Sequence, residues 1–524
     1  MRTALVPLPR KLEERDGSFR LVPGAAIGFE GPGSAREIAE LLAEYLRPAT
    51  GFALPVREGA GAVTLVQTAS DPAPDDAGFL PEDYALDVAP GGVRIEAATS
   101  WGLARGVQTL RQLFPPETYG AEARPGVAWE APSVRIEDAP SLRWRGLMLD
   151  VSCHFFSADD VCRFVELLAQ HRMNVFHWHL TDDQGWRVEI RKYPRLTEVG
   201  SVRAETLVGH ADRYPRRFDG IPHGGFYAQD DIRRVVAFAA RRRVVVVPEI
   251  DMPGHMCAAI ASYPELGNGE WAHPAVLSVW GISRHVLNME ESTLAFCKDV
   301  WDEVMELFPS RFLHVGGDEA PRREWEESKR AQALMAERGL TRPEQLQAWF
   351  TKELDAFFRS RGRRLLGWDE ILEGGIDPSA AVAAWRVGWK GWDYVDAAAR
   401  AGHDIVLATN SHAYFDYYQD EPVAEEPLAI CGMIPTSKVY AFDPRIPSAP
   451  PDAARRVLGG QGQLWTEYIG TRDYLDYMAY PRASALAEVL WTPPERRRYA
   501  GFLDRLSAHR ARLGVQGVAA HPRP

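Results

Sequence analysis

The sequence predicts an α/β protein in which a (β/α)8 TIM barrel follows a small α+β domain. From residue 143 onward, short apolar segments alternate with segments of helical periodicity, as in a parallel sheet with crossover helices. Most of these apolar segments lack polar alternation, which is typical of strands buried on both faces. The length of 524 residues leaves room for two or three domains.

Eight segments after residue 143 are candidate barrel strands. They are 145–152, 174–182, 244–252, 312–317, 364–369, 381–386, 404–409 and 460–465. Helical segments lie between them. Ser157 with Asp160 has the pattern of a capping box that begins a helix reaching to about His171. Eight such strand–helix units predict a (β/α)8 barrel, to which we assign residues 139–524.

Residues 1–138 are expected to form the small α+β domain and its linker. Within them, alternating apolar residues at 84–88 and 93–97 surround a Pro-Gly-Gly turn, which predicts a β-hairpin. Apolar residues then follow helical spacing over 103–114. Residues 115–142 are rich in Pro, Gly, Ala and Glu, and we expect them to be a linker.

The bulk composition excludes several classes of partner. Lys and Arg total 60 and Asp and Glu total 72, which gives a net charge of −12 and no general attraction for nucleic acid or anionic membranes. No segment approaches the apolar length of a membrane span. The N-terminus has no apolar run of signal-peptide length, so we expect a cytoplasmic protein. Five widely spaced cysteines show neither a disulfide framework nor a CxxC metal pattern.

The carboxyl ends of the predicted strands are unusually polar and aromatic, and active sites of such barrels lie at these ends. The residues concerned are His177 to Trp186, Glu249 to His255, Asp318 and Glu319, Trp368 to Glu370, Trp385, Tyr414 to Asp416, and Trp465 to Glu467. One polar strand end could arise by chance. The same bias at six or more ends predicts a single polar pocket walled by indole rings.

The run Phe312-Leu-His-Val-Gly-Gly-Asp-Glu-Ala320 is the most informative segment. Its two glycines allow a tight turn and close approach of a ligand. Carboxyl groups with aromatic walls suit glycoside hydrolysis, which usually uses two carboxyl groups on either side of the bond. Neighbours in a strand point in different directions, so Asp318 and Glu319 are poorly placed to attack one carbon from opposite faces. One could instead protonate the leaving oxygen while the other holds a substrate group, such as 2-acetamido, that is itself the nucleophile.

At this point the chain resembles glycoside hydrolase family 20, the β-N-acetylhexosaminidases. The matching runs are RGLMLDVS (145–152), HWHLTDDQGWR (177–187), PEIDMPGH (248–255), HVGGDEA (314–320), GWDEIL (367–372), YFD (414–416) and GGQGQLWTEY (459–468). They occur in order and cover essentially the whole barrel, and the N-terminal region resembles the domain that precedes it in this family. The resemblance implies a retaining exo-enzyme that acts on oligosaccharides or glycoconjugates with terminal β-linked GlcNAc or GalNAc. It implies no metal or organic cofactor.

The resemblance also implies roles for single residues. Glu319 would be the general acid and then the base, Asp318 would orient the acetamido group and stabilise an oxazolinium-like intermediate, and Tyr414 would hydrogen-bond the acetamido carbonyl. The remaining expected site residues are Trp368, Trp385 and Trp465 as pocket walls, Asp416 and Glu467 on sugar hydroxyls, Asp182 and His255 beside the acid and the substrate, and Asp251 and His179 in support.

One position departs from the family pattern. Relatives carry Ser-Arg-His after the first barrel strand, whereas this chain has Ser152-Cys153-His154. In relatives the arginine binds the 3- and 4-hydroxyls of the terminal sugar, and cysteine cannot replace its planar five-donor group. Losing such bonds costs about 1.5–3 kcal/mol each, so we expect hexosamine turnover to be weakened about ten- to a hundredfold. Another arginine in that space, a substrate that differs there, or a degraded activity would each account for the cysteine.

Two other functions compete with the hydrolase. A sugar-binding protein on the same scaffold would be inactive because of Cys153, although a binder has no need of an acid and base. A metal-dependent hydrolase is suggested by His177-Trp-His179, a pattern that can ligate zinc with further ligands such as His255 and Asp251. For Asp318 and Glu319 themselves, the ordinary alternative is a solvated loop after an edge strand.

Overall fold

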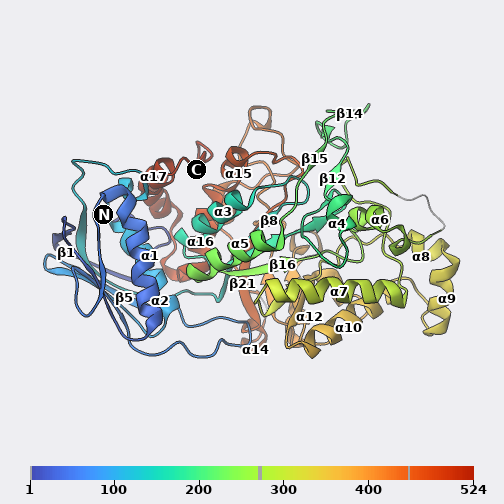
Figure 1. Ribbon diagram of the computed structural model, residues 1–524, viewed down its shortest axis with the longest axis horizontal. Helices are drawn as coiled ribbons and strands as arrows, with labels where there is room; N and C mark the ends of the chain where they lie inside the picture. The colour runs from blue at the N-terminus through green and yellow to red at the C-terminus, as the bar shows by residue number, and fades with distance from the viewer. Residues whose placement is uncertain (1–2, 270–273, 447–448) are drawn as a thin grey trace.

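The computed structural model describes residues 3–269, 274–446 and 449–524. Figure 1 shows two parts side by side along the longest axis. The N-terminal part, in blue, is a sheet with two helices against it, and the larger part is a closed parallel barrel with helices around it. The predicted fold class is confirmed.

The N-terminal domain contains a seven-stranded sheet. Its strands, in spatial order, are β1 (Lys11–Arg20), β7 (Glu130–Asp138), β5 (Tyr84–Ala89), β6 (Gly92–Ala97), β4 (Val63–Gln67), β2 (Ile27–Glu30) and β3 (Val56–Glu58). Helices α1 (Gly33–Thr50) and α2 (Ser100–Leu113) pack against this sheet and bury their apolar faces. The β5–β6 pair is antiparallel and is the hairpin that the alternation predicted.

The expectation that residues 115–142 form a linker is wrong for part of that range. Strand β7 lies inside it and pairs with both β1 and β5, so it belongs to the interior of the sheet. Val134 and Ile136 point into the core, and charged residues alternate with them. Proline and glutamate in this segment suggested a loop, but it pairs with strands on both sides, and its buried residues alternate with period two over residues 134–137.

The second part is a closed barrel in which all eight predicted strands are present. They are β8 (Trp144–Asp150), β9 (Val175–His179), β16 (Val245–Glu249), β17 (Phe312–His314), β18 (Arg364–Trp368), β19 (Ala381–Ala384), β20 (Ile405–Leu407) and β21 (Val457–Leu464). Each pairs in parallel with its neighbours, and β21 closes the barrel against β8. The carboxyl ends of all eight strands therefore meet at one end of the barrel.

Helices surround the barrel and cover its outer surface (Figure 1). The longer ones are α3 (Ala158–Gln170), α5 (Gln229–Arg241), α7 (Glu291–Leu307), α9 (Lys329–Glu337), α10 (Glu344–Ser360), α12 (Asp393–Arg400), α15 (Arg472–Ala479), α16 (Arg482–Trp491) and α17 (Tyr499–Val515). The predicted capping box of Ser157 and Asp160 is present at the start of α3. Among the described residues, no helix combines the length and the apolar character needed to cross a bilayer.

Buried ion pairs join the two parts. Arg145 on barrel strand β8 donates from Nη2 to both carboxylate oxygens of Glu82, at 2.8 and 2.7 Å. Arg172, after α3, donates to Asp138 Oδ2 at 2.8 Å, and Trp491 Nε1 donates to the same carboxylate. All five side chains are buried. Arg145 and Arg172 of the barrel thus have carboxylate partners in the N-terminal domain.

Candidate active site

A cavity of about 230 Å³ opens at the carboxyl ends of the barrel strands. It is lined by Cys153, Asp182, Gln184, Asp251, His255, Gly281, Ile282, Asp318, Glu319, Trp385, Trp389, Tyr414, Asp416, Tyr417, Ile430, Cys431, Trp465 and Glu467. All of the site residues expected from the sequence are in this lining except Trp368 and His179. The strand ends therefore converge on one pocket.

A larger cavity, of about 830 Å³, lies at the other end of the barrel, between the barrel and the N-terminal domain. Its acidic side chains Asp71 and Asp75 are engaged by backbone N–H groups, for example that of Ser100 at 2.8 Å from Asp71. The neighbours Asp75 and Asp76 both line it, but they are exposed, and Asp75 is also paired with Arg143 at 3.0 Å. We therefore place the candidate chemistry in the smaller cavity.

The acid pair sits on a sharply bent backbone. Strand β17 ends at His314, and Gly316 and Gly317 follow with φ of +64° and +98°. Glu319 itself has φ of +47°, a left-handed conformation that is uncommon and strained for a residue with a Cβ. This bend turns both carboxyl groups into the cavity.

Glu319 is set up as an acid near neutral pH. Burial and the negative charge of Asp318 together raise the pKa of its carboxyl group to about 7, against the opposing charge of His255. A carboxyl group with such a pKa can hold a proton and give it to a leaving oxygen at physiological pH.

Asp318 is buried beside Asp251 and His255. Burial raises the pKa of Asp318, while His255 and a hydrogen bond from Asp251 oppose that rise. Burial and the charge of Asp318 together raise the pKa of Asp251 well above its ordinary range. Of Asp251 and Asp318, Asp251 is thus the one that keeps a proton. It can donate a hydrogen bond that favours the ionised form of Asp318.

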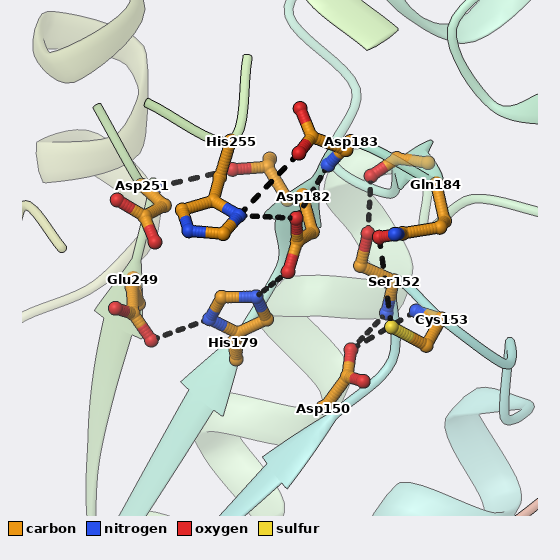
Figure 2. Close-up of polar contacts among 12 residues, drawn as sticks. Asp150, Ser152, Cys153, His179, Asp182, Asp183, Gln184, Glu249, Asp251 and His255 are labelled. Atoms are coloured by element: carbon orange, nitrogen blue, oxygen red, sulfur yellow. Dashed lines mark hydrogen bonds and ion pairs between the residues drawn. The ribbon is translucent and has the colours of Figure 1, made fainter. Parts of the chain in front are cut away.

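A chain of alternating charges runs from the barrel interior toward the acid pair, and Figure 2 shows its part from Glu249 through His179 and Asp182 to His255. His255 Nδ1 lies 2.9 Å from Asp182 Oδ1, and its Nε2 lies 3.9 Å from Glu319 Oε2. Asp182 Oδ2 lies 3.3 Å from His179 Nε2, and His179 Nδ1 lies 2.6 Å from Glu249 Oε2. His179 is therefore placed behind the cavity, where it holds Asp182.

The charges of this chain stabilise one another. Burial alone would lower the pKa of His255 and His179, but the neighbouring carboxylates outweigh it and raise both pKa values well above the ordinary range. Burial would likewise raise the pKa of Asp182, but His255 and His179 lower it. The resulting positive His255 faces Asp318 and Glu319 and holds them in place.

Aromatic rings form the walls of the cavity. Trp385 and Tyr414 stack with ring centres 6.2 Å apart and an angle of 18° between their planes. Trp385 Nε1 donates to Glu370 Oε2 at 3.0 Å. Burial raises the pKa of Tyr414 well above its ordinary value, so its hydroxyl group remains a hydrogen-bond donor. Trp465 forms another part of the wall.

Trp368 lies beneath the cavity lining. It is 1% exposed, and its ring centre lies 4.7 Å from that of His314 and 6.0 Å from that of Trp465. The side chain therefore supports Trp465 from behind in this structure. It lies at the end of β18, but its ring lies next to those of His177 and His314 and is not part of the lining.

The far wall is acidic and contains Cys153. Burial raises the pKa of Asp416 to about 7, and burial together with Asp416 raises that of Glu467 well above its ordinary range. Asp416 Oδ1 has no hydrogen-bond partner among the described residues. No described residue of the lining is an arginine or a lysine. Arg203 lies behind Cys153 and donates to its carbonyl oxygen at 2.6 Å, outside the cavity lining.

Cys153 is a packed thiol. Its N–H donates to Asp150 Oδ1 at 3.1 Å, and Sγ lies 3.6 Å from Gln184 Oε1 (Figure 2). Burial raises its pKa well above the ordinary value, so the nucleophilic thiolate is disfavoured. The site chemistry is thus carried by the carboxyl groups.

The histidines of the HxH pattern do not form an open metal site. His177 Nε2 and His179 Nδ1 lie 3.0 and 2.6 Å from the same oxygen of Glu249 in the barrel interior. His255 and Asp251 face the acid pair instead. Among the described residues, His177 and His179 do not meet in one group of possible ligands: Asp251 lies with His179 and Glu249, and His255 lies with Asp251 and Asp318, in separate buried groups whose ligand atoms are within 4.8 Å of one another.

Several lining residues were not singled out in the sequence. Gln184 lies within the run HWHLTDDQGWR, but its contact with Cys153 depends on the turn after β9. Ile282, Trp389 and Cys431 come from segments without strand or helix periodicity. The exposure of Trp389, 65%, distinguishes it from a core tryptophan, and the sequence does not reveal that exposure.

Comparison with known proteins now decides the family. The model of "Glycosyl hydrolase family 20, catalytic domain" matches residues 142–494, and that of "Glycosyl hydrolase family 20, domain 2" matches residues 2–139. The chain belongs to glycosyl hydrolase family 20. It is therefore a glycoside hydrolase, as the resemblance implied.

Relatives within family 20 agree with this assignment. The β-hexosaminidase of Porphyromonas gingivalis is 38% identical over 99% of this chain, which spans 64% of the length of that relative. The β-N-acetylhexosaminidase of Cellulomonas fimi is 32% identical over 99% of this chain and 96% of its own length. An aspartate variant of the Streptomyces plicatus β-hexosaminidase, solved with its product GlcNAc, is 33% identical with a TM-score of 0.85, covering 100% and 97% of the two chains.

Proposed function

We propose that this chain is a retaining exo-β-N-acetylhexosaminidase that releases terminal β-linked GlcNAc or GalNAc by substrate-assisted catalysis. The proposal rests on one observation: Glu319, with its pKa raised to about 7, lies beside a buried Asp318 in one cavity. Solved family 20 relatives from Streptomyces plicatus and Vibrio harveyi hold GlcNAc, which supports the choice of sugar.

The nucleophile is assigned to the substrate because the carboxyl groups of the cavity are poorly suited to that role. Asp318 directly precedes the acid in the chain and is held by Asp251 and His255. Asp416 and Glu467 have raised pKa values, to about 7 for Asp416, so they are largely protonated where Glu319 can still act as an acid. A protonated carboxyl group is a poor nucleophile. A 2-acetamido carbonyl oxygen can reach the anomeric carbon instead.

The reaction then has two steps. In the first, Glu319 gives its proton to the glycosidic oxygen while the acetamido oxygen bonds to the anomeric carbon and the glycosidic bond breaks. In the second, water attacks the anomeric carbon while the Glu319 carboxylate takes a proton from that water. The bond between the acetamido oxygen and the anomeric carbon then breaks. Each step inverts the carbon, so the product keeps the β configuration.

The remaining groups stabilise the charge and hold the sugar. Ionised Asp318 stabilises positive charge on the acetamido nitrogen, and the Tyr414 hydroxyl group donates to the carbonyl oxygen. Trp385, stacked on Tyr414, and Trp465 exclude water from this part of the cavity, which strengthens these interactions.

Cys153 retunes or weakens binding at the other wall. Without an arginine or a lysine in the described lining, sugar hydroxyl groups at this wall meet the carboxyl groups of Asp416 and Glu467. This is the one observation that favours the second candidate, a sugar-binding member of the family with impaired catalysis. The raised pKa of Glu319 favours the enzyme, because a binder gains nothing from a group poised to transfer protons.

The test is hydrolysis of p-nitrophenyl 2-acetamido-β-glucoside and -galactoside, compared with the β-glucoside that carries a 2-hydroxyl group. We expect turnover only with the acetamido group, and the β anomer of the product should appear first in proton NMR. Glu319→Gln and Asp318→Asn should each lower kcat at least a hundredfold. Comparable turnover of the plain β-glucoside, or first release of the α anomer, would overturn the proposal. Tight binding of GlcNAc without turnover would favour the sugar-binding alternative.

A further inference from the structure

The cavity of about 830 Å³ between the barrel and the N-terminal domain has no part in the proposed reaction. Its volume is within the range of about 300–1,000 Å³ that is typical of small-ligand sites. One wall belongs to the N-terminal domain, and the facing wall belongs to the segments that precede β16, β17 and β18. The wall segments are 71–78 and 100–101 of the first part, and 243–246, 309–311 and 362–363 of the barrel. A ligand here would lie at the opposite end of the barrel from the bond that is cleaved.

Trp101 gives this cavity an aromatic surface. It lies in the first turn of α2 and is only partly buried. The ring of Phe79 packs against it edge-on, with centres 6.3 Å apart and planes at 66°, while the indole also lines the cavity. An indole ring that is packed on one side and open to a cavity on the other is suited to contact with the C–H face of a sugar ring.

Arg311 and Arg363 supply hydrogen-bond donors on the facing wall. Arg311 donates to the carbonyl oxygen of Gly362. Arg363 donates to the carbonyl oxygens of Ser310 and Met305. Burial and the charge of Arg311 lower the pKa of Arg363, and no carboxylate of the described chain offsets them. Since each guanidinium group has five N–H donors, several remain for a ligand.

Carboxylates line the side of the N-terminal domain, and one of them is available to a ligand. Asp71 accepts from the N–H of Ser100 at 2.8 Å, and Asp75 is paired with Arg143 at 3.0 Å. Asp76 is exposed and forms no ion pair with a described residue. The cavity thus presents free donors on one wall and a free acceptor on the other. A hydroxyl group can both accept and donate, so a polyhydroxyl ligand satisfies both walls.

The two walls are already held in place by contacts between the two parts. A Cβ atom on Gly78 would lie 3.2 Å from the Cβ atom of Arg311, so the loop of the N-terminal domain lies directly against the barrel there. Arg105 of α2 donates to the carbonyl oxygen of Arg243 at 2.6 Å. A site that is formed before its ligand arrives loses less conformational freedom on binding.

We propose that this cavity is a second, non-catalytic site that binds a segment of a neutral oligosaccharide. One pyranose would pack on Trp101, accept hydrogen bonds from Arg311 and Arg363, and donate one to Asp76. An anion would face the carboxylate and a cation would face the guanidinium groups, so a neutral ligand fits better. The choice of a sugar among neutral polyols rests on the proposed function, in which the substrate is itself a glycan. Such a site would keep the enzyme on a long or branched glycan between cleavage events.

The test separates the two sites by their tryptophans. Glu319→Gln, labelled with 5-fluorotryptophan, would be titrated with N,N′,N″-triacetylchitotriose and followed by fluorine NMR. Tryptophan-to-phenylalanine substitutions at single positions assign the signals of Trp101 and of Trp465 in the active site. Sodium sulfate at the same concentrations is the probe for an anion site.

We expect the Trp101 signal to shift and saturate with the trisaccharide and to stay in place with sulfate. Arg311→Met should weaken this binding at least about fivefold, because it removes donors to the sugar. Arg361→Met is the matched control and should change it less than twofold, because Arg361 is also exposed, is paired with Asp302 at 3.0 Å and lies outside the lining. In the background with Glu319 intact, both variants should hydrolyse an aryl substrate within twofold of the unmodified enzyme.

The remaining outcomes distinguish this site from the proposed function. A Trp101 signal that stays in place while that of Trp465 shifts would overturn the second site and leave the proposed function standing. A Trp101 signal that responds to sulfate alone would also overturn it, in favour of an anion site. If the unmodified enzyme hydrolyses no acetamido glycoside, the proposed function fails, and a saturating shift of Trp101 with the trisaccharide would still support the second site.

Discussion

The carboxyl group of Asp251 occupies the space where Gly316 would carry a side chain if it were any other residue. A Cβ atom on Gly316 would lie 1.8 Å from Asp251 Oδ1. The next residue, Gly317, donates its N–H to that same oxygen at 3.0 Å. The backbone that carries the acid pair is therefore shaped around a buried carboxyl group from the neighbouring strand.

Gly316→Ala should strongly impair the enzyme. The methyl group cannot coexist with Asp251 in its present place, so the turn before Glu319 must shift, and displaced catalytic groups commonly lose about a hundredfold in rate. We expect kcat to fall at least that far. Gly339→Ala is the matched control, because Gly339 has nearly the same φ, +66°, and open space around it. It should cost about 1 kcal/mol of stability and leave kcat within twofold, measured by thermal unfolding and steady-state kinetics.

The alkaline limb of the pH profile should report Glu319. The group acts as an acid only below its pKa, which is raised to about 7, so kcat/KM should fall as pH rises through about 7. Because Asp318 contributes to that rise, Asp318→Asn should move the limb to lower pH in its residual activity. The profile would be measured between pH 4 and 9 with an aryl substrate. A limb that stays in place in Asp318→Asn would contradict the assigned coupling.

Asp416 should make the folded state less stable as pH rises. Burial raises its pKa to about 7 in the folded protein, whereas the unfolded chain ionises near the ordinary value of 3.8. Protonated Asp416 contributes fully to the free energy of unfolding below its pKa in the unfolded chain, 3.8, and this contribution is lost as pH rises through its pKa in the folded protein, about 7. The total loss is up to about 4 kcal/mol. Asp416→Asn cannot ionise, so its unfolding free energy should fall less between pH 5 and 8. Equal pH dependence in the two proteins, measured by denaturant unfolding, would count against this burial effect.

Cys153→Arg should restore a cationic partner for the acidic wall. Asp416 and Glu467 have none in the described lining, so an arginine there would gain charge-assisted hydrogen bonds to them and to sugar hydroxyl groups. We expect kcat/KM on aryl β-GlcNAc and β-GalNAc to rise at least tenfold. Cys153→Ser, which changes only the thiol, should leave it within threefold.

The opposite result would be equally informative about this wall. If the unmodified chain is already efficient and the arginine lowers its kcat/KM, then the pocket has been rebuilt around Cys153 and the substrate differs at its 3- or 4-position. If neither protein turns over either substrate, then the sugar-binding alternative gains support.

The barrel and its acid pair could be predicted because local sequence determines them. Apolar runs without alternation specify strands buried on both faces, and Asp318 and Glu319 follow the glycine turn directly. Strand β7 was missed because Pro132 and flanking polar residues obscure its alternation, and only pairing with β1 and β5 makes it a strand. Its structure depends on partners more than 40 residues away in the sequence.

The position of each aromatic side chain could not be predicted in the same way. Trp368 and Trp385 both end barrel strands, yet the first packs on His314 below the cavity and the second lines it. Direction at a strand end depends on the local turn, which the sequence pattern does not specify. Trp389 lies four residues after Trp385, on the short helix α11 (Val387–Lys390) that follows β19, and this helix determines where its side chain lies. Such side chains are placed by tertiary packing.

The ion pairs between Arg145 and Glu82, and between Arg172 and Asp138, make the stability of each part depend on the other. A barrel expressed alone would lose the carboxylates that pair with these two guanidinium groups, and removing one partner of a buried pair commonly costs about 3–5 kcal/mol. The N-terminal domain therefore supplies the counter-charges of two buried arginines in the barrel, although none of its described residues lines the candidate active site. An exchange of one part by recombination would keep the barrel stable only if the new N-terminal domain also carried carboxylates opposite Arg145 and Arg172. We therefore expect the two parts to be inherited together.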